Sequence, residues 1–339
     1  MDSSLLLERN KKILEAVIQK FAATAKPVSS KTIAPYFRLS SATIRHIFSE
    51  LEQAGYLGHP HTSAGRIPTD RGYRLYVDSL MEAKHLTPEE QELIKEKYRR
   101  ISTQKRDMRQ IIPFLLADLV HYPAITLTIW DKSSLRHIEF LKLDKRRLVI
   151  LLVMSTGLTK DQVVLLKREI AHDFLKELTD DLNRELGGHN LREVLAWLED
   201  RWPLDKEVED ILTHLLSMIE GILDEEISLE GVYMISREPE FFDGRRLGKL
   251  LKTLEERQIL AEIINRHQNQ EGPWVSIGQE NLCPDIQNCS LVMATYRNKQ
   301  ETVGTLGIIG PTRMRYERVV PVVDFVSKMA TTMLTEGEI

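Results

Sequence analysis

The residues with the clearest chemical potential form a polar group early in the chain. They are hydroxylated or cationic, they sit near the start of a segment with helical periodicity, and they are Ser41, Thr43, Arg45, His46 and Ser49. Side chains of this kind at the N-terminal end of a helix contact base edges and phosphates when that helix enters a major groove. Arg45 has the reach for guanine edges or a phosphate, whereas Thr43 and Ser49 suit phosphate or sugar contacts. We therefore expect this face to contact double-stranded DNA.

A second polar group lies in a turn-forming stretch shortly afterwards. His61, Thr62 and Ser63 fall within residues 60–65, whose proline and glycine predict a turn between two short strands. The tip of such a hairpin lies along a DNA backbone or enters a minor groove. We expect Thr62 and Ser63 to hold the tip and His61 to contact the backbone. The cations expected to neutralise phosphates are Lys31, Arg66 and Arg71.

Other residue patterns do not predict a catalytic, cofactor or metal site. The GTLGIIG segment at 304–310 lacks the spacing of a dinucleotide-binding loop, and a proline follows it where a helix should begin. Cys283 and Cys289 have no nearby histidine pair, so they do not match the common zinc spacings. His59 and His61 flank a proline in an exposed turn, which favours backbone or phosphate contact over metal binding. We expect a protein that is not an enzyme.

The elements that must position the polar groups are three helices and a hairpin. A first amphipathic helix ends before Pro27, and a second, short one starts at Ser29 or Ser30. Ser40 or Ser41 caps the third. Apolar residues recur at helical spacing in the first and third helices: Ile13, Leu14, Val17, Ile18 and Phe21, then Ile44, Phe48 and Leu51. A hairpin directly after the third helix is typical of a winged helix-turn-helix.

The distribution of charge agrees with DNA binding by the N-terminal part alone. Residues 1–85 contain 12 Lys/Arg and 8 Asp/Glu, whereas the remainder contains 34 and 42, within a total net charge of −4. A basic module on an acidic body is expected when one domain touches phosphate and the rest does not. The lack of an apolar run long enough to span a membrane, the lack of a signal-peptide pattern and the sparse cysteines predict a cytoplasmic protein with no membrane partner.

Several blocks of the sequence resemble a known family. The stretch PHTSAGRIPTDRGYRLYVD at 60–78 is similar to the signature of the heat-inducible transcription repressor HrcA family, and KPVSSKTIA and LSSATIR resemble its helix-turn-helix. Residues 276–297 and 304–316 resemble its C-terminal blocks. The family usually has an Asn-Asp pair where this chain has His46-Ile47. Arg45 carries over as a DNA contact, but the roles of the missing pair do not, and a packed Ile47 would alter how the operator is read.

The rest of the chain has the pattern of an interrupted α+β domain. Four strands are predicted between residues 124 and 170, helices over 171–230, a strand at 231–236, and then helices, two strands and a closing helix. The overall fold class is multidomain α+β. The resemblance implies a winged helix at 1–85, a GAF-like domain in two segments, 86–170 and 231–339, and an inserted dimerisation domain at 171–230.

The resemblance also implies the biological role. It implies a homodimer that represses chaperone operons by binding an inverted-repeat operator of the CIRCE type, with the chaperonin GroEL as a partner. Two other hypotheses stay open: a regulator gated by a metabolite bound to the GAF-like domain, and an enzyme with an appended DNA-binding domain. The first would show ligand-induced thermal stabilisation, and the second a cleft of titratable residues with perturbed pKa values.

Overall fold

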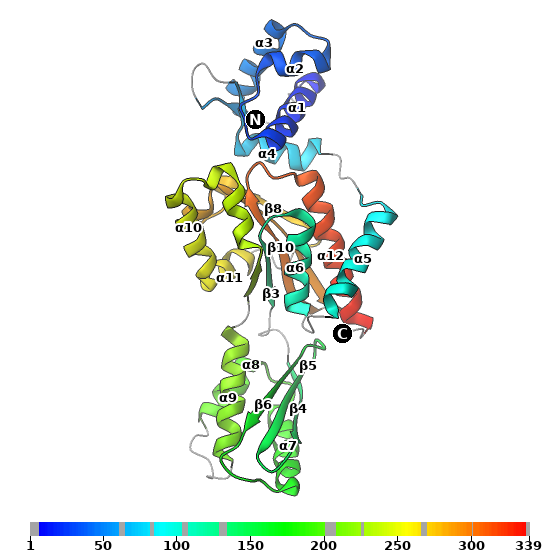
Figure 1. Ribbon diagram of the computed structural model, residues 1–339, viewed down its shortest axis with the longest axis vertical. Coiled ribbons are helices and arrows are strands. Elements are labelled where there is room, and N and C mark those ends of the chain that lie inside the picture. The colour runs from blue at the N-terminus through cyan, green and yellow to red at the C-terminus, as the bar shows by residue number, and fades with distance from the viewer. Residues whose placement is uncertain are drawn as a thin grey trace. The chain divides into compact units, whose positions relative to one another are not determined.

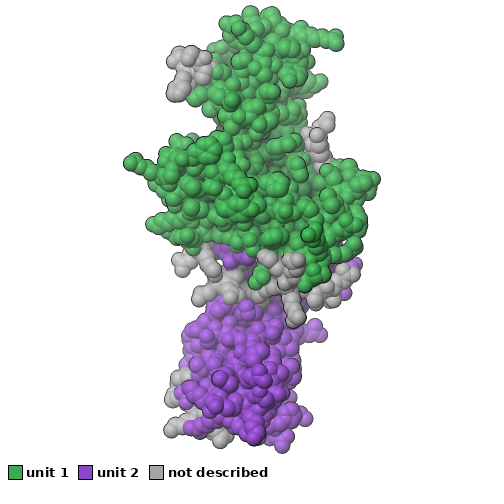
Figure 2. Space-filling model, in the orientation of Figure 1, with its two compact units in different colours: residues 1–125, 229–294, 306–326 green, residues 126–228, 295–305, 327–339 purple. Residues whose placement is uncertain are grey.

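The computed structural model describes most of the chain in two compact units. The described residues are 7–60, 65–81, 85–103, 108–128, 134–200, 208–224, 227–265, 270–299 and 301–336. Unit 1 comprises residues 1–125, 229–294 and 306–326, and unit 2 comprises residues 126–228, 295–305 and 327–339 (Figure 2). The described part of the molecule is mixed α and β, as the sequence predicts.

Unit 1 begins with helices and a short hairpin, at the positions that the sequence predicts (Figure 1). These elements are α1 (Glu8–Thr24), α2 (Ser30–Phe37), α3 (Ser41–Gln53), β1 (Leu57–Gly58), β2 (Ile67–Pro68), α4 (Asp70–Leu75) and a π-helical turn, η2 (Tyr76–Leu80). β1 and β2 pair antiparallel. The predicted apolar stripes of α1 and α3 are buried except for Phe21, which is half-buried. Ile33 on α2 and Tyr73 and Tyr76 beyond the hairpin are also buried, so one core holds these elements together.

The next segment of the chain leads from two helices into a five-stranded sheet. A reciprocal pair of hydrogen bonds between Thr87 and Glu90 starts α5 (Pro88–Ser102). α6 (Met108–Val120) follows. The sheet has the order β7-β3-β10-β9-β8. Its strands are β3 (Ala124–Thr128), β7 (Ile227–Glu230), β8 (Trp274–Ile277), β9 (Cys289–Asn298) and β10 (Glu301–Pro311).

Shorter elements connect the strands of this sheet, and a long helix ends the chain. The connecting elements are the 3-10 helices η3 (Val232–Arg237), η4 (Pro239–Phe241), η5 (Gly278–Glu280) and η6 (Pro284–Ile286), with α10 (Gly244–Glu255) and α11 (Arg257–Asn265). α12 (Tyr316–Glu336) is the closing helix that the sequence predicts, and it buries Val319, Val322, Val323, Val326 and Ala330.

Unit 2 contains a three-stranded antiparallel meander with helices against it. The strands β4 (Leu135–Lys142), β5 (Arg147–Met154) and β6 (Thr159–Leu165) pair in sequence order. The helices are α7 (His172–Leu186), α8 (Leu191–Asp200) and α9 (Glu209–Asp224). The Asn183 side chain on α7 both accepts from the Ile138 N–H and donates to the Ile138 carbonyl, each at 2.8 Å, and so satisfies backbone groups of the edge strand β4.

The four strands predicted between 124 and 170 are all present, with β3 in the five-stranded sheet and the other three in the meander. Two other predictions for this part of the chain differ from the structure. Residues 227–230, predicted as helical, form the strand β7. The strand predicted at 231–236 is wrong, because the strand ends at Glu230 and residues from Val232 onward form a 3-10 helix. Gly231 has a positive φ of 71°, which turns the chain out of the extended conformation. The residue boundaries expected for the three domains stay predictions.

The lengths and compositions of the described helices bear on whether any of them could cross a membrane. No described helix has both the length and the apolar character that crossing a lipid bilayer requires.

Two adjacent residues of α3, Ile47 and His46, provide a direct test of how this helix packs against the core of α1 to α4. Ile47 is 1% exposed, whereas the side chain of its neighbour His46 is 78% exposed. Replacing Ile47 by Ala should lower the free energy of unfolding by roughly 2–5 kcal/mol, because it removes buried methyl groups and leaves a cavity. His46→Ala, the matched control, should change it by less than about 0.5 kcal/mol. Denaturant unfolding measures the free energy of unfolding of both variants. Equal losses would contradict the orientation of α3 in which Ile47 faces the core and His46 faces solvent.

Candidate nucleic-acid interface

Helix α3 presents one apolar face to the core and one polar face to solvent. The Ser40 side chain caps the helix by accepting the Thr43 N–H at 3.0 Å, so Ser40 is the N-cap of the two serines considered. Ile44, Ile47, Phe48 and Leu51 are buried. Their burial fixes the rotation of the helix and leaves three of the predicted contact residues exposed: Arg45, His46 and Ser49.

Two further residues from the predicted set lie at the start of α3 and are half-buried. The Ser41 hydroxyl lies 2.7 Å from the Ser30 hydroxyl, which ties the start of α3 to the start of α2. The Thr43 hydroxyl lies 2.8 Å from that of Ser40. These hydroxyls therefore orient the N-terminal end of α3 within the protein, and each retains capacity for further hydrogen bonds.

The second half of α3 carries carboxylates, which limits where an anion can approach. Glu50 accepts a hydrogen bond from the Asn10 amide at 2.8 Å and lies 3.2 Å from Nε2 of His46. Neither Asn10 nor Glu50 was predicted to matter from the sequence. Since Glu50 is negative, the face of α3 that suits a phosphate or a base edge is its N-terminal half, around Arg45.

The base of the hairpin is held by backbone pairing to the segment before α2. Val28 and Arg66 exchange both backbone hydrogen bonds, at 2.8 and 2.9 Å. A Cβ on Gly65 would lie 2.6 Å from the Val28 carbonyl, so this position requires glycine. The pairing fixes where the hairpin leaves the helical core. The predicted tip residues His61, Thr62 and Ser63 lie outside the described residues.

The Arg66 side chain, predicted to neutralise a phosphate, has a partner within the protein. Its Nη2 lies 2.8 Å from a carboxylate oxygen of Glu52, and Glu52 also contacts His59. The Arg66 side chain is only 21% exposed. A phosphate at this position would therefore compete with Glu52 for the guanidinium group, an interaction that the sequence pattern did not indicate.

Lys31 and Arg71, the other predicted cations, are both exposed. The Arg71 guanidinium lies 4.9 Å from the centre of the Tyr56 ring, a cation–π contact that orients the side chain. On α2, Tyr36 is 72% exposed, although apolar periodicity alone would place an aromatic residue inside. Its hydroxyl is an exposed hydrogen-bond donor on α2, and Tyr36 was not among the contact residues predicted from the sequence.

The described residues show no alternative metal-based chemistry. Within the described ranges, no group of three or more His, Cys, Asp or Glu side chains is arranged to hold a metal ion. The two cysteines are free, and burial raises the pKa of the Cys289 thiol to about 12, which keeps it protonated and unreactive at neutral pH.

Comparisons with known proteins identify the family of this chain. The profile of the family described as "HrcA protein C terminal domain" matches residues 112–320. The chain is 36% identical to the heat-inducible transcription repressor HrcA of Geobacter sulfurreducens, over 98% of both chains. It is 35% identical to the protein of the same name from Desulforamulus reducens, over 95% of both.

A solved structure supports the fold as a whole. A hypothetical protein with a crystal structure at 2.2 Å resolution shares the fold with a TM-score of 0.68 at 20% sequence identity, over 98% of this chain and 99% of that one. The full-length matches, together with the profile that covers more than half of the chain, identify the family. The chain belongs to the HrcA family of heat-inducible transcription repressors.

Proposed function

We propose that this protein is a homodimeric repressor of heat-shock operons that places two winged helices on an inverted repeat of the CIRCE type. In this proposal, α1 to α3 form the helix-turn-helix, β1 and β2 form the wing, and the five-stranded sheet belongs to the GAF-like domain. The observation that carries the proposal is the exposed, partly cationic face of α3. Membership of the repressor family supports it. Each protomer supplies a single recognition helix, and pairing two half-sites supplies the affinity that one lacks.

The proposed DNA contacts differ in what they read. Arg45 stands exposed in the N-terminal half of α3, where a recognition helix reaches base edges, so it is the residue we assign to base readout. Lys31, Arg71 and Arg66 contact phosphates, Arg66 after releasing Glu52. Because Ile47 is buried, the His46-Ile47 departure leaves only His46 exposed to the groove.

The sheet of unit 2 offers a surface for dimerisation. Leu141, Val149 and Val163 are cross-strand neighbours on its outer face, and Leu141 and Val163 are 48% and 57% exposed. Leu143 and Leu165 flank them at 53% and 63%. Exposed apolar side chains that adjoin one another mark an interaction surface, and we assign it to a second copy of the chain. The insert would then comprise the meander as well as the helices.

We further propose that the chaperonin GroEL maintains the DNA-binding form, an expectation that comes from the family. Heat diverts the chaperonin to other unfolded proteins, and repression then falls. This part of the proposal concerns folding rather than the DNA contacts.

A gel shift on a CIRCE-type inverted repeat tests the operator and the chaperonin together. At fixed salt, the purified protein should bind the repeat at least about 10³-fold more tightly than scrambled DNA. Added GroEL should increase the fraction of protein that binds. Equal binding to both DNAs would contradict the proposed operator, and an unchanged active fraction would contradict only the chaperonin dependence.

Substitution of Arg45 separates base readout from folding. Arg45→Ala should weaken operator binding by about 1–3 kcal/mol while the free energy of unfolding stays nearly the same, because the side chain is exposed. Arg99→Ala on α5 removes the same charge from a side chain that is 68% exposed and is the matched control. Fluorescence anisotropy gives the affinities. Equal losses in both variants would show that only the total charge matters.

Charged substitutions on the outer sheet face test the dimer. Val163→Asp and Leu165→Asp should each shift the protein towards monomer, since a carboxylate in an apolar interface loses its hydration. Leu282→Asp changes a leucine that is 62% exposed in unit 1 and should leave the dimer intact. Sedimentation equilibrium measures the mass, and a dimer that survives both substitutions would place the interface elsewhere.

A further inference from the structure

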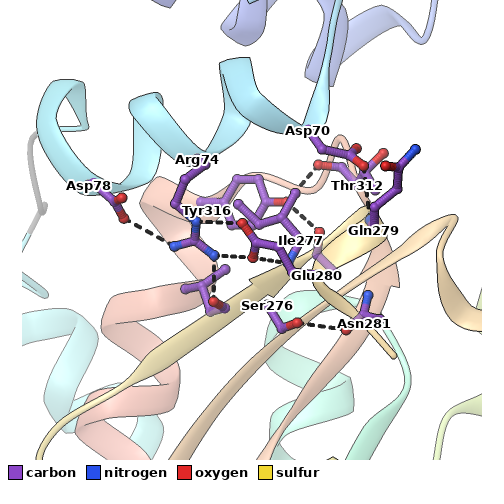
Figure 3. Close-up of polar contacts among 12 residues, drawn as sticks. Asp70, Arg74, Asp78, Ser276, Ile277, Gln279, Glu280, Asn281, Thr312 and Tyr316 are labelled. Atoms are coloured by element: carbon purple, nitrogen blue, oxygen red, sulfur yellow. Dashed lines mark hydrogen bonds and ion pairs between the residues drawn. The ribbon is translucent and has the colours of Figure 1, made fainter. Parts of the chain in front are cut away.

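The blocks of sequence that resemble the family but lie far apart in the chain meet at one place in unit 1. Asp70 and Arg74 come from the first block, Gln279 and Glu280 from the second, and Tyr316 from the third (Figure 3). None of these side chains belongs to the proposed DNA contacts. Their meeting point is the short helix α4, which follows the hairpin directly. We call the contacts of α4 with residues 275–280 and with Tyr316 the α4 junction.

One side of α4 is fixed to the end of the recognition helix. The Thr69 hydroxyl donates to the Gly55 carbonyl at 2.7 Å and accepts the Gly72 N–H at 3.1 Å. A Cβ on Gly72 would overlap the Tyr56 carbonyl, so the helix and the residues after α3 are in close contact. Because Gly55 and Tyr56 directly follow α3, any rotation of α4 must carry α3 with it.

The other side of α4 is fixed to the end of β8 through Arg74. Its Nε donates to Glu280 at 2.8 Å, its Nη2 contacts the second oxygen of the same carboxylate, and Nη2 also donates to the Val275 carbonyl at 2.7 Å. Asp78 accepts from Nη1 at 3.0 Å. A guanidinium group held at all three nitrogens has a defined orientation, which a single point charge would not have.

Residues 277–280 contact α4 closely through backbone groups and a glycine. The Asp70 carboxylate accepts the Gln279 N–H at 2.9 Å, and the Glu280 carboxylate also accepts the Ile277 N–H at 2.8 Å. Gly278 has a φ of 53°, and a Cβ there would overlap the Asp70 carboxylate. This position therefore requires glycine both for its backbone conformation and for the close approach of α4.

Buried aromatic and charged side chains make further contacts between the N-terminal helices and the residues around the start of α12. The Tyr73 and Tyr316 rings lie 5.9 Å apart, and the Tyr316 hydroxyl donates to the Thr312 carbonyl at 2.7 Å. Arg313, 7% exposed, donates to the Ala22 carbonyl near the end of α1 at 3.0 Å. Helix α1 is thus joined to the loop that precedes α12, and α4 is joined to the first residue of α12.

We propose that the α4 junction, through the Arg74–Glu280 pair, sets the orientation of the recognition helix and thereby determines which half-site spacing the dimer accepts. The inference rests on the proposed function, because spacing matters only if two protomers bind one inverted repeat. One extra base pair between half-sites rotates one of them by about 35° around the DNA axis. A recognition helix held from both sides of α4 does not follow that rotation. Arg74 and Glu280 are positioning residues that do not touch DNA.

The test compares three DNAs: the inverted repeat, the same repeat with one base pair added between its halves, and a single half-site. Arg74→Ala should weaken binding to the correctly spaced repeat by about tenfold. It should leave half-site affinity unchanged and reduce the preference for the correct spacing. Glu280→Gln retains the size of the side chain and an acceptor for the Ile277 N–H, and it should shift the preference in the same direction. Arg99→Ala is the control for the loss of a positive charge.

The outcomes separate this inference from the proposed function. If the wild-type protein does not prefer the inverted repeat over scrambled DNA, the proposed function fails. If it does, and both junction variants keep the wild-type spacing preference, the inference is wrong. It is also wrong if half-site affinity falls as much as that for the full repeat, since the substitutions would then damage the DNA-binding helices themselves. Should Arg74→Ala fail to fold, as thermal melting would show, the isosteric Glu280→Gln variant decides.

Discussion

The short helix α4 is held on two sides, and the orientation proposed for α3 depends on these contacts. Its first turn is capped by Thr69, whose hydroxyl also binds the backbone after α3, while Asp70 and Arg74 bind the residues after β8. Exposed ion pairs alone contribute little to stability, about 0–1 kcal/mol each. Here the guanidinium group also binds a backbone carbonyl, so its main consequence is orientation rather than stability.

In the proposed DNA complex, the arrangement of charge around α3 would direct DNA to one part of the helix. Arg45 is exposed in the N-terminal half, whereas Glu50 and Glu52 lie in the C-terminal half and contact Asn10, His46, His59 and Arg66. An approaching phosphate is attracted at one end and repelled at the other, unless it displaces Arg66 from Glu52. A cation such as Arg66 must leave its carboxylate partner before it can bind a phosphate, which costs free energy. This cost favours a correctly placed DNA duplex, which makes further contacts, over a random polyanion.

The features that were predicted correctly from the sequence depend on residues close to one another in the chain. The Ser40 cap, the apolar stripe of α3 and the hairpin after Gly55 all involve residues close in sequence, and the structure contains each of them. The strand predicted at 231–236 failed because a run of apolar residues does not distinguish a strand from a 3-10 helix. The Asp70–Gln279 bond joins residues 209 positions apart, and only the fold brings them together. Similarly, no pattern indicated that Arg66 would pair with Glu52.

A hydroxyl-radical footprint of the wild-type protein on the inverted repeat most directly tests the claim that two recognition helices bind one operator. The proposed dimer predicts two protected patches of equal strength, one in each half-site, related by the two-fold axis of the repeat and separated by one helical turn of DNA or a multiple of it. A single protected half-site, or uniform protection across the repeat, would contradict the claim.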